Sequence, residues 1–402
     1  MIRVSTADLY LNSQNTINAD QSAMMTTTAE LSSGKQINSP ADNPVGAGQA
    51  ALLQSDLTQL GQYKSNQAQA TGLLNNASST VTQALNVLQT ANTTLVQAGN
   101  GTLNDSDRSA LAAQLQQDLD QLVGLANTSD GQGGYLFGGS VNSTPPFVQN
   151  GNTVTYVGDS LVPGLQISQT RSEQVKYSGA SVFMSLPSGN GTFATAAAST
   201  NTGTGAISTG SVTNPSALTG DQYTITIQPG ATTYTITQTP PGTTGAPLPL
   251  SPAGPTSLPI PGMQVTLSGA AQAGDTFTIS PSTNQSIFSV LASAISALQT
   301  PTTTPAAAAQ VSAAVTNALA GTQQGISSLS TTQASMGAQL AELNTYATVN
   351  SDQALQDQTQ MSAVVDLNYA QGASQLAQQQ TEYQAALQSY AAISKLSLFN
   401  YI

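Results

Sequence analysis

Residues 74–98 read LNNASSTVTQALNVLQTANTTLVQA, and this stretch decides how the chain folds. Its apolar side chains recur at spacings that alternate between 3 and 4 residues. That alternation is typical of a coiled-coil helix, whose seam faces a partner helix. Large and small residues alternate along the seam, so a partner can approach closely. The seam consists of Leu74, Ala77, Val81, Ala84, Leu88, Ala91, Leu95 and Ala98.

A second stretch near the C-terminus repeats the same spacing from Met336 to Val364. Asn350 and Asp357 fall at seam positions, where polar residues cost stability but set register and oligomeric state. We therefore expect the chain ends to order only in an assembly; the alternative is a seam register shifted by one residue. The two stretches are predicted to pair within one chain through Leu74, Val81, Leu88 and Leu95 on one side and Met336, Leu340 and Leu343 on the other.

The outermost helical segments carry sparser apolar residues than residues 74–98. The N-terminal segment ends at Gly34, a favourable helix C-cap, and the C-terminal segment has aromatic residues on one face. Because such sparse seams bury little surface alone, we predict that they form the interface between copies of the chain. The predicted interface residues are Leu9, Ile17, Met24 and Leu31, together with Tyr383, Leu387, Tyr390, Ile393 and Leu396.

The composition changes between about Gly131 and Ser282, where Gly, Pro, Thr and Ser dominate and the apolar period becomes 2. Phe147–Val157 predicts a hairpin around an Asn-Gly turn, and Tyr223–Thr237 predicts another across Pro229-Gly230. The Pro-rich stretch Pro240–Pro261 is expected to be a loop. The middle of the chain is therefore a β region inserted between helical ends.

The predicted fold class is α+β: a long-helix coiled-coil bundle formed by the N- and C-terminal segments, with an inserted small all-β domain. Residues 1–44 and 365–402 are expected to be terminal coiled-coil assembly segments that line an inner tube. Residues 45–140 and 285–364 are expected to form a helical bundle domain. Residues 141–284 are expected to form the surface-exposed β domain.

The charge of the chain excludes several classes of partner. Charged residues make up only 6% of the sequence, the formal net charge is −12, and no basic residue lies between Lys176 and Lys395. A nucleic-acid-binding protein needs a basic stripe, so nucleic acid is excluded as a partner. No apolar run reaches the roughly 20 residues of a membrane span, which argues against membrane insertion. Met1–Tyr10 has no apolar core, so it does not read as a Sec signal peptide.

The residue types in the chain also limit its chemistry. It contains no histidine and no cysteine, which removes the usual nucleophilic triads, thiolate chemistry and common zinc sites. Asn104–Asp107 resembles the start of a calcium loop but lacks the required Gly and Glu in register, so helix capping is the better interpretation. We predict no catalytic, cofactor-binding or metal-binding residues, and a structural protein rather than an enzyme.

Several motifs resemble those of a known family. Leu31–Asp42 (LSSGKQINSPAD) resembles the N-terminal motif of bacterial flagellins and their hook-associated relatives, and Ala98–Arg108 resembles the inter-helix turn of that family. Within the family, the resemblance is to the junction proteins between hook and filament. It is carried by Asp42-Asn43-Pro44, by Gly134–Ser140 followed by Pro146-Phe147, and by the ending Lys395–Ile402.

The resemblance implies a place in the bacterial flagellum. It implies a ring of about eleven copies, a neighbouring hook-associated protein on the hook side and flagellin on the filament side. It also implies export, without a Sec signal peptide, through the flagellar type III apparatus to an extracellular position. An export chaperone would bind the C-terminal helix before export.

Two alternatives remain open at this point. The nearest is a flagellin-like filament subunit, against which the ending and the Gly134–Ser140 turn argue. The second is a surface adhesin or enzyme displayed by the β region, which lacks a catalytic constellation. Flagellins carry two arginines that matter for recognition by the vertebrate flagellin receptor. This chain has Thr90 and Asn92 in their place, so the resemblance does not imply that recognition.

Overall fold

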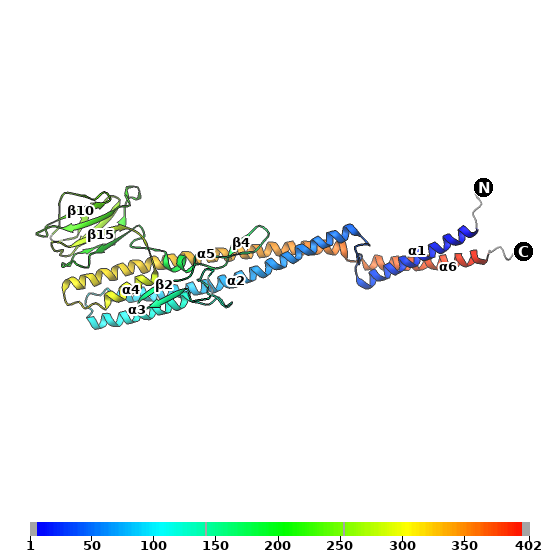
Figure 1. Ribbon diagram of the computed structural model, residues 1–402, viewed down its shortest axis with the longest axis horizontal. Coiled ribbons are helices and arrows are strands. Elements are labelled where there is room, and N and C mark those ends of the chain that lie inside the picture. Colours follow the sequence, from blue (N-terminus) through cyan, green and yellow to red (C-terminus); the bar gives the residue numbers. More distant parts are fainter. Residues whose placement is uncertain (1–5, 141–142, 252–253, 396–402) are drawn as a thin grey trace. The chain divides into compact units, whose positions relative to one another are not determined.

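The computed structural model describes residues 6–140, 143–251 and 254–395 (Figure 1). Its contacts divide the chain into a terminal unit, Met1–Ser65 with Thr345–Ile402, and a central unit, Asn66–Asn344. The division falls within the two longest helices, α2 (Pro44–Ala98) and α5 (Pro305–Val365). Each of these helices therefore contributes one part to each unit. Within the described residues, no helix has the length and apolar character that crossing a membrane requires.

The terminal unit contains two further helices, α1 (Thr6–Ser33) and α6 (Tyr369–Lys395), which lie side by side (Figure 1). Gly34 ends α1 at a φ of 72°, and its N–H donates to the carbonyl of Glu30 at 2.8 Å. Only glycine adopts this left-handed conformation without strain, which explains the sharp helix end. Asn43 caps α2 by accepting a hydrogen bond from the Gly46 N–H at 2.9 Å.

The central unit adds helices α3 (Asp105–Ala126) and α4 (Ile287–Leu298), which pack against each other. Asn104 caps α3 by accepting from the Asp107 N–H at 2.9 Å, as the capping interpretation of this stretch predicts. A reciprocal pair of hydrogen bonds between Ser286 and Ser289 caps α4. The buried side chains of α4 fill the space beside α3; they are Ile287, Phe288, Val290, Leu291, Ala294, Ile295 and Leu298.

The first strands of the β region pack on the helices of the central unit. The hairpin of β1 (Phe147–Asn150) and β2 (Thr153–Tyr156) turns at Gly151, as predicted from its Asn-Gly pair. The ring of Phe147 lies 5.2 Å from that of Phe288 in α4 and 5.6 Å from that of Phe183, between ring centroids. The contact with Phe183 is edge-to-face, a geometry that adds to the gain from burial. The short strands that follow are β3 (Gly164–Gln166), β4 (Ser172–Gln174) and β5 (Leu186–Pro187), the last paired with β16 (Asn284–Gln285).

The remaining strands form an antiparallel β domain with a core of its own. One sheet has the order β11-β10-β9-β15-β6, with β12 also paired to β10; in a second sheet β14 pairs with β13, β7 and β8. Phe193, Ile225, Val265, Phe277 and Ile279 are among its buried core residues. The strands are β6 (Phe193–Ala197), β7 (Ala206–Ile207), β8 (Ser211–Val212), β9 (Gln222–Ile227), β10 (Thr233–Thr239), β11 (Thr243–Thr244), β12 (Leu248–Pro249), β13 (Thr256–Leu258), β14 (Met263–Ser268) and β15 (Thr276–Pro281).

The structure confirms the α+β class, with long helices at both chain ends and a small antiparallel β domain between them. The expected loop over Pro240–Pro261 is wrong in part, because β11, β12 and β13 lie within it. These strands are only two or three residues long, and their partners, not local patterning, hold them in place. The predicted single β insert, residues 141–284, also divides into strands packed on helices and a separately cored domain.

Candidate assembly interface

The predicted seam of α2 lies at the centre of the central unit. Leu74, Val81, Leu88 and Leu95 are completely buried. The side chains of Asn92 and Thr322 are joined by a hydrogen bond of 2.9 Å, and those of Gln333 and Thr82 by one of 2.8 Å. The two bonds set an antiparallel register between α2 and α5 in this unit, which brings Leu88 beside Gly325.

This register changes which α5 residues complete the seam. Of the predicted partners, Met336 and Leu343 are buried and Leu340 is half-buried. Met336, Leu340 and Leu343 lie beside the N-terminal part of the α2 seam. The α5 residues that precede Met336 lie beside its C-terminal part. The predicted seam of this helix began at Met336 and therefore omitted the upstream stripe. The stripe continues the spacing of 3, 4 or 7 residues through Val311, Val315, Ala318, Thr322 and Leu329, all buried.

The residues that follow β3 and flank β4 bond to both helices of this pair. Gln67 of α2 donates to the carbonyl of Ile167 at 2.8 Å. Arg171 forms an ion pair with Glu342 of α5 at 2.8 Å, and the Tyr177 hydroxyl donates to Gln339 at 2.5 Å. Burial raises the pKa of Tyr177, so this hydroxyl stays protonated at neutral pH.

A buried ion pair closes the turn after α3. The Lys176 ammonium lies 2.8 Å from a carboxylate oxygen of Asp130, whose other oxygen accepts from the backbone N–H groups of Gln132 and Gly134. Burial acts to raise the pKa of the Asp130 carboxyl, but these hydrogen bonds outweigh burial and hold the pKa below its ordinary value. The Gly131–Gly134 turn is thus organised by a carboxylate and serves the fold.

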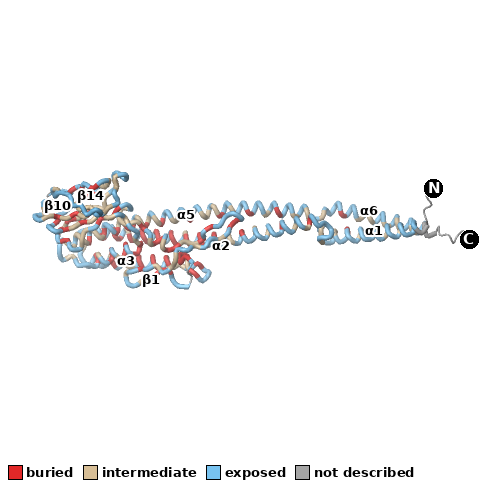
Figure 2. Tube along the Cα trace, turned by 45° about the horizontal axis from the view of Figure 1, so that its top comes forward, coloured by how far each residue is buried: buried red, intermediate tan, exposed pale blue. Residues whose placement is uncertain are grey.

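The two helices of the terminal unit bury far less. Among the side chains described in α1 (residues 8–33), Ile17, Met24 and Leu31 are half-buried, and Leu9 is 42% exposed. Thr27 is the only buried residue of that stretch. In Figure 2 these helices are mostly the pale blue of exposed residues, whereas the bundle of α2, α3 and α5 carries the red of buried ones. The predicted interface residues of α1 therefore retain exposed surface in the single chain.

The predicted interface residues of α6 do not all share one face. Tyr383 and Tyr390 are half-buried, and the ring of Tyr390 lies 5.1 Å from that of Tyr10, with the two hydroxyls hydrogen-bonded. Leu387 is 41% exposed, because the inward stripe of α6 passes through Ala386 instead. The side chain of Ile393, and Leu396 altogether, lie outside the described residues.

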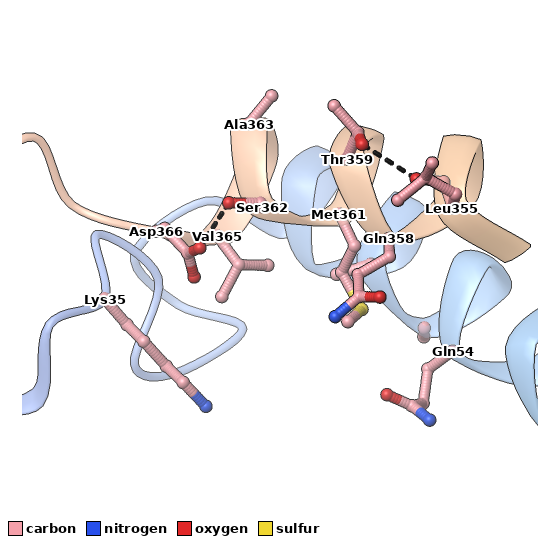
Figure 3. Close-up of a pocket in the computed structure, with 12 residues that line it drawn as sticks. Lys35, Gln54, Leu355, Gln358, Thr359, Met361, Ser362, Ala363, Val365 and Asp366 are labelled. Carbon is pink, nitrogen blue, oxygen red and sulfur yellow. Dashed lines mark hydrogen bonds between the residues drawn. The ribbon is translucent and has the colours of Figure 1, made fainter.

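A hydrogen-bonded joint connects the α1–α6 pair to the α2 and α5 parts of the same unit. Lys35 and Asp366 form an antiparallel bridge, the Gln36 N–H donates to Val365, and the Leu367 N–H donates to Gly34. Backbone N–H groups of Ser39 and Asn38 donate to Asp42 and hold the pKa of its carboxyl below its ordinary value. The connection between α1 and α2 is thus hydrogen-bonded to the connection between α5 and α6, where Figure 3 shows Lys35 and Asp366.

The α2 and α5 parts of the terminal unit meet in a seam that contains polar residues. Leu53 and Tyr63 of α2 and Asn350 and Asp357 of α5 are all buried. Asp357 accepts a hydrogen bond of 2.7 Å from Gln353 on its own helix. Buried polar side chains make such a seam less stable than apolar side chains would, unless each polar group has its hydrogen-bond partners.

Exposed apolar surface concentrates in the terminal unit. Of the large apolar side chains that are exposed in the described residues, ten lie there and four lie in the larger central unit. The ten are Leu9, Tyr10, Leu11, Met25, Val45, Leu52, Val349, Leu355, Tyr369 and Leu387.

The described residues offer little catalytic chemistry. No group of three acidic, histidine or cysteine side chains within them is placed to hold a metal ion. Asp118 of α3 is buried with one carboxylate oxygen unpartnered, and burial raises its pKa. A single buried carboxyl of this kind does not make a catalytic site. The exposed apolar side chains of the terminal unit are therefore the best candidate for a functional surface.

Comparisons with known proteins agree with this architecture. The family model of the bacterial flagellin N-terminal helical region matches residues 4–142, and that of the flagellar hook-associated protein 1 D2-like domain matches residues 196–281. Flagellar hook-associated protein 3 of Salmonella typhimurium is 26% identical over 399 residues, 99% of each chain.

Two solved structures from Legionella pneumophila are similar as well. Flagellar hook-associated protein-3 is 31% identical, covering 78% of this chain and 98% of that one, with a TM-score of 0.72. The flagellar junction protein FlgL is 30% identical, covering 80% of this chain and 100% of that one, with a TM-score of 0.68.

Proposed function

The chain belongs to the family of flagellar hook-associated protein 3 (FlgL), and on that premise we propose that it connects the flagellar hook to the flagellin filament. The observation that carries this proposal is the extent of the similarity. Full-length relatives are matched from end to end, including both helical ends and the β domain. The work of such a subunit is mechanical and involves no catalytic step.

The partners follow from this position. We propose that about eleven copies form a ring, with another hook-associated protein on the hook side and flagellin on the filament side. The match of residues 4–142 to the flagellin N-terminal region supports a surface that can join a flagellin lattice. A filament-subunit role would explain that match too, but not the end-to-end similarity to hook-associated protein 3.

We propose that the α1 and α6 faces are covered by other copies in the assembly. The supporting observation is that Leu9 and Leu387 are exposed while Ile17, Met24 and Tyr383 are only half-buried. Burying these apolar surfaces would drive association at about 25 cal/mol for each Å² removed from water. In this proposal residues 1–44 and 365–402 line the inner tube.

Export is proposed to precede assembly. The chain would leave the cell unfolded through the flagellar type III apparatus, with a chaperone covering the C-terminal helix until then. Absence of cysteines suits an unfolded passage, because no disulfide has to form or break. Tyr369 and Leu387 expose apolar surface on α6 that a chaperone groove could cover.

A clean deletion of the gene tests the proposal. Electron microscopy should show hooks without filaments, and flagellin should accumulate in the medium, because subunits are exported but find no junction. Re-expression of the chain should restore filaments. Bare basal bodies or normal filaments in the deletion strain would contradict the junction role. Hooks without filaments and without any flagellin made would indicate a filament subunit instead.

A further inference from the structure

The chain contains three Asn-Gly pairs, and the fold restrains them to very different degrees. They are Asn100-Gly101, Asn150-Gly151 and Asn190-Gly191. The backbone nitrogen of a glycine can attack the side-chain amide of a preceding asparagine, because glycine has no side chain that shields this nitrogen. The hydrogen bonds that hold the asparagine side chain and the glycine N–H therefore decide which pair can react in the folded chain.

The Asn190 pair is held at both reacting groups. The Oδ1 atom of Asn190 accepts from the Thr192 N–H at 3.0 Å, and its Nδ2 atom donates to the Gly210 carbonyl at 3.2 Å. The Gly191 N–H donates to the Ser188 carbonyl at 3.2 Å. Both groups must break hydrogen bonds before they can meet.

The Asn100 pair is held at one of the two groups. The Oδ1 atom of Asn100 accepts from the N–H of Thr102 at 3.2 Å and from its hydroxyl at 2.9 Å. The Gly101 N–H makes no hydrogen bond within the described residues. Only the side chain is restrained in this turn.

The Asn150 pair is free at both groups. In the part of the chain that the structure describes, neither the Asn150 carboxamide nor the Gly151 N–H makes a hydrogen bond, and both residues are exposed. Asn150 and Thr153 form the last pair of the β1–β2 ladder. Opening of that end pair lets the Asn150 side chain rotate toward the Gly151 nitrogen, and the end of a hairpin opens at low free-energy cost.

We propose that Asn150 is a site of spontaneous deamidation, which converts it to aspartate and isoaspartate while the chain stays folded. The Gly151 nitrogen bonds to Cγ of Asn150 and gives up its proton, the Cγ–Nδ2 bond breaks, and ammonia leaves a cyclic imide. Water then opens the ring. Its addition at Cγ gives aspartate, and its addition at the backbone carbonyl carbon gives isoaspartate, whose main chain runs through Cβ. The reaction consumes water and requires no oxidant, reductant or metal.

The modification changes the attachment of the hairpin tip to α3. The Gln149 amide donates to Asp120 of α3 at 2.7 Å and to the Gly151 carbonyl at 3.1 Å. Isoaspartate lengthens the main chain between residue 150 and Gly151, which moves that carbonyl relative to Gln149. It also adds a negative charge to a tip that is attached to α3 through a carboxylate. Both changes weaken the attachment.

The base of the hairpin is attached independently. The Asn127 side chain accepts from the Phe147 N–H at 2.9 Å and donates to the Phe147 carbonyl at 2.8 Å. The Phe147 ring is buried. Deamidation at Asn150 should therefore loosen residues 149–153 and leave the attachment at Phe147 intact.

Peptide mass spectrometry of the purified full-length chain tests the proposal. The chain is incubated at mildly alkaline pH, which favours loss of the glycine N–H proton, in water enriched in heavy oxygen. Incorporated heavy oxygen separates conversion during the incubation from conversion during digestion. We expect Asn150 to convert at least about tenfold faster than Asn190, with Asn100 between them, because the hydrogen bonds to be opened increase in that order.

The same incubation in concentrated urea is the reference. The unfolded chain should convert the three pairs at similar rates, because each asparagine precedes a glycine and no fold restrains it. If folded Asn150 converts no faster than Asn100 and Asn190, the assignment of this site is wrong. An Asn150 that is fastest by the same factor in urea would also overturn it, because the fold would then play no part.

Asn150→Gln is the control for the structural consequence, since it keeps an amide whose longer side chain closes the corresponding ring far more slowly. After equal incubation, wild-type chain should show faster amide hydrogen exchange over residues 149–153 than Asn150→Gln, with equal exchange at Phe147. Equal exchange at the tip in converted wild type and variant would show that deamidation does not release the hairpin from α3.

Discussion

The central and terminal units use the same device, a pair of antiparallel helices with a heptad seam, and bury it to very different degrees. In the central unit Leu74, Leu88 and Leu95 have no exposed surface, and the residues around β3 and β4 bond to the helices from outside. In the terminal unit the seam includes Asn350 and Asp357, and the apolar residues of α1 are only half-buried. The difference indicates a central unit that buries its apolar seam within one chain and a terminal unit that leaves more of its apolar surface exposed.

The largest expected difference between the two units is in the stability lost when an apolar side chain is truncated to alanine. Leu88→Ala removes a completely buried side chain and should lower the free energy of unfolding by about 4 kcal/mol. Ile17→Ala in α1 is the matched change at a half-buried site and should lower the free energy of the monomer by less than about 1 kcal/mol. Urea unfolding followed by circular dichroism measures both. Equal losses would contradict the comparison.

The buried ion pair of the central unit should have the next largest effect. Lys176→Met leaves the Asp130 carboxylate buried without its cation and should cost about 3 kcal/mol. The folded pKa of Asp130 lies below its unfolded value, so the pair stabilises the fold above the unfolded pKa and is lost as pH falls through the folded one. Wild-type stability should therefore fall below a pH of about 4.

The control for this pH dependence is Asp130→Asn, which keeps the two backbone hydrogen bonds possible but removes the titrating group. Its loss of stability between neutral and acidic pH should be smaller than that of the wild type. An unchanged acid dependence would show that other carboxyls, and not this pair, govern it.

In the polar seam of the terminal unit, a substitution should raise the free energy of unfolding, in contrast to the losses expected in the central unit. Asp357→Leu replaces a buried carboxylate by an apolar residue at a heptad position and should stabilise the monomer by about 1 kcal/mol. Amide hydrogen exchange should then show stronger protection over residues 345–365. Val290→Leu in α4, an apolar change in the central unit, is the control and should leave that protection unchanged. Weaker protection in Asp357→Leu would mean that the carboxylate stabilises the single chain.

The smallest effect is expected where α1 meets α6. Tyr390→Phe removes the hydroxyl that bonds to Tyr10 but keeps the ring contact, so it should cost no more than about 0.5 kcal/mol in the monomer. Tyr390→Ala removes the ring as well and should increase hydrogen exchange along α1 more than Tyr390→Phe does. Identical exchange in the two variants would show that the ring contributes nothing to the pairing.

The sequence predicted the elements that depend on local pattern. The α2 seam, the capping by Asn104 and the turn at Gly151 follow from spacing and side-chain chemistry alone. The register between α2 and α5 did not follow, because a heptad repeat pairs equally well after a shift of seven residues. Only contacts such as Asn92–Thr322 decide among those registers.

Other features depend on contacts between segments far apart in the sequence. Phe147, Phe183 and Phe288 come from different elements, and their cluster is what attaches the first hairpin to α4. Leu387 lies off the predicted face of α6, because the half-buried stripe of this helix passes through Tyr383, Ala386 and Tyr390.

The joint at Gly34–Lys35 and Asp366–Leu367 has a consequence for how the chain ends come together. It fastens α1 and α6 to each other at one end, so their pairing resembles the closing of a hairpin and not an encounter of two free helices. Loop-closure entropy is smallest next to the joint and grows along the helices. Ordering should therefore start at Leu31 and Gly372 and advance toward Tyr10 and Tyr390, so that the last turns to settle are the ones farthest from the fastening.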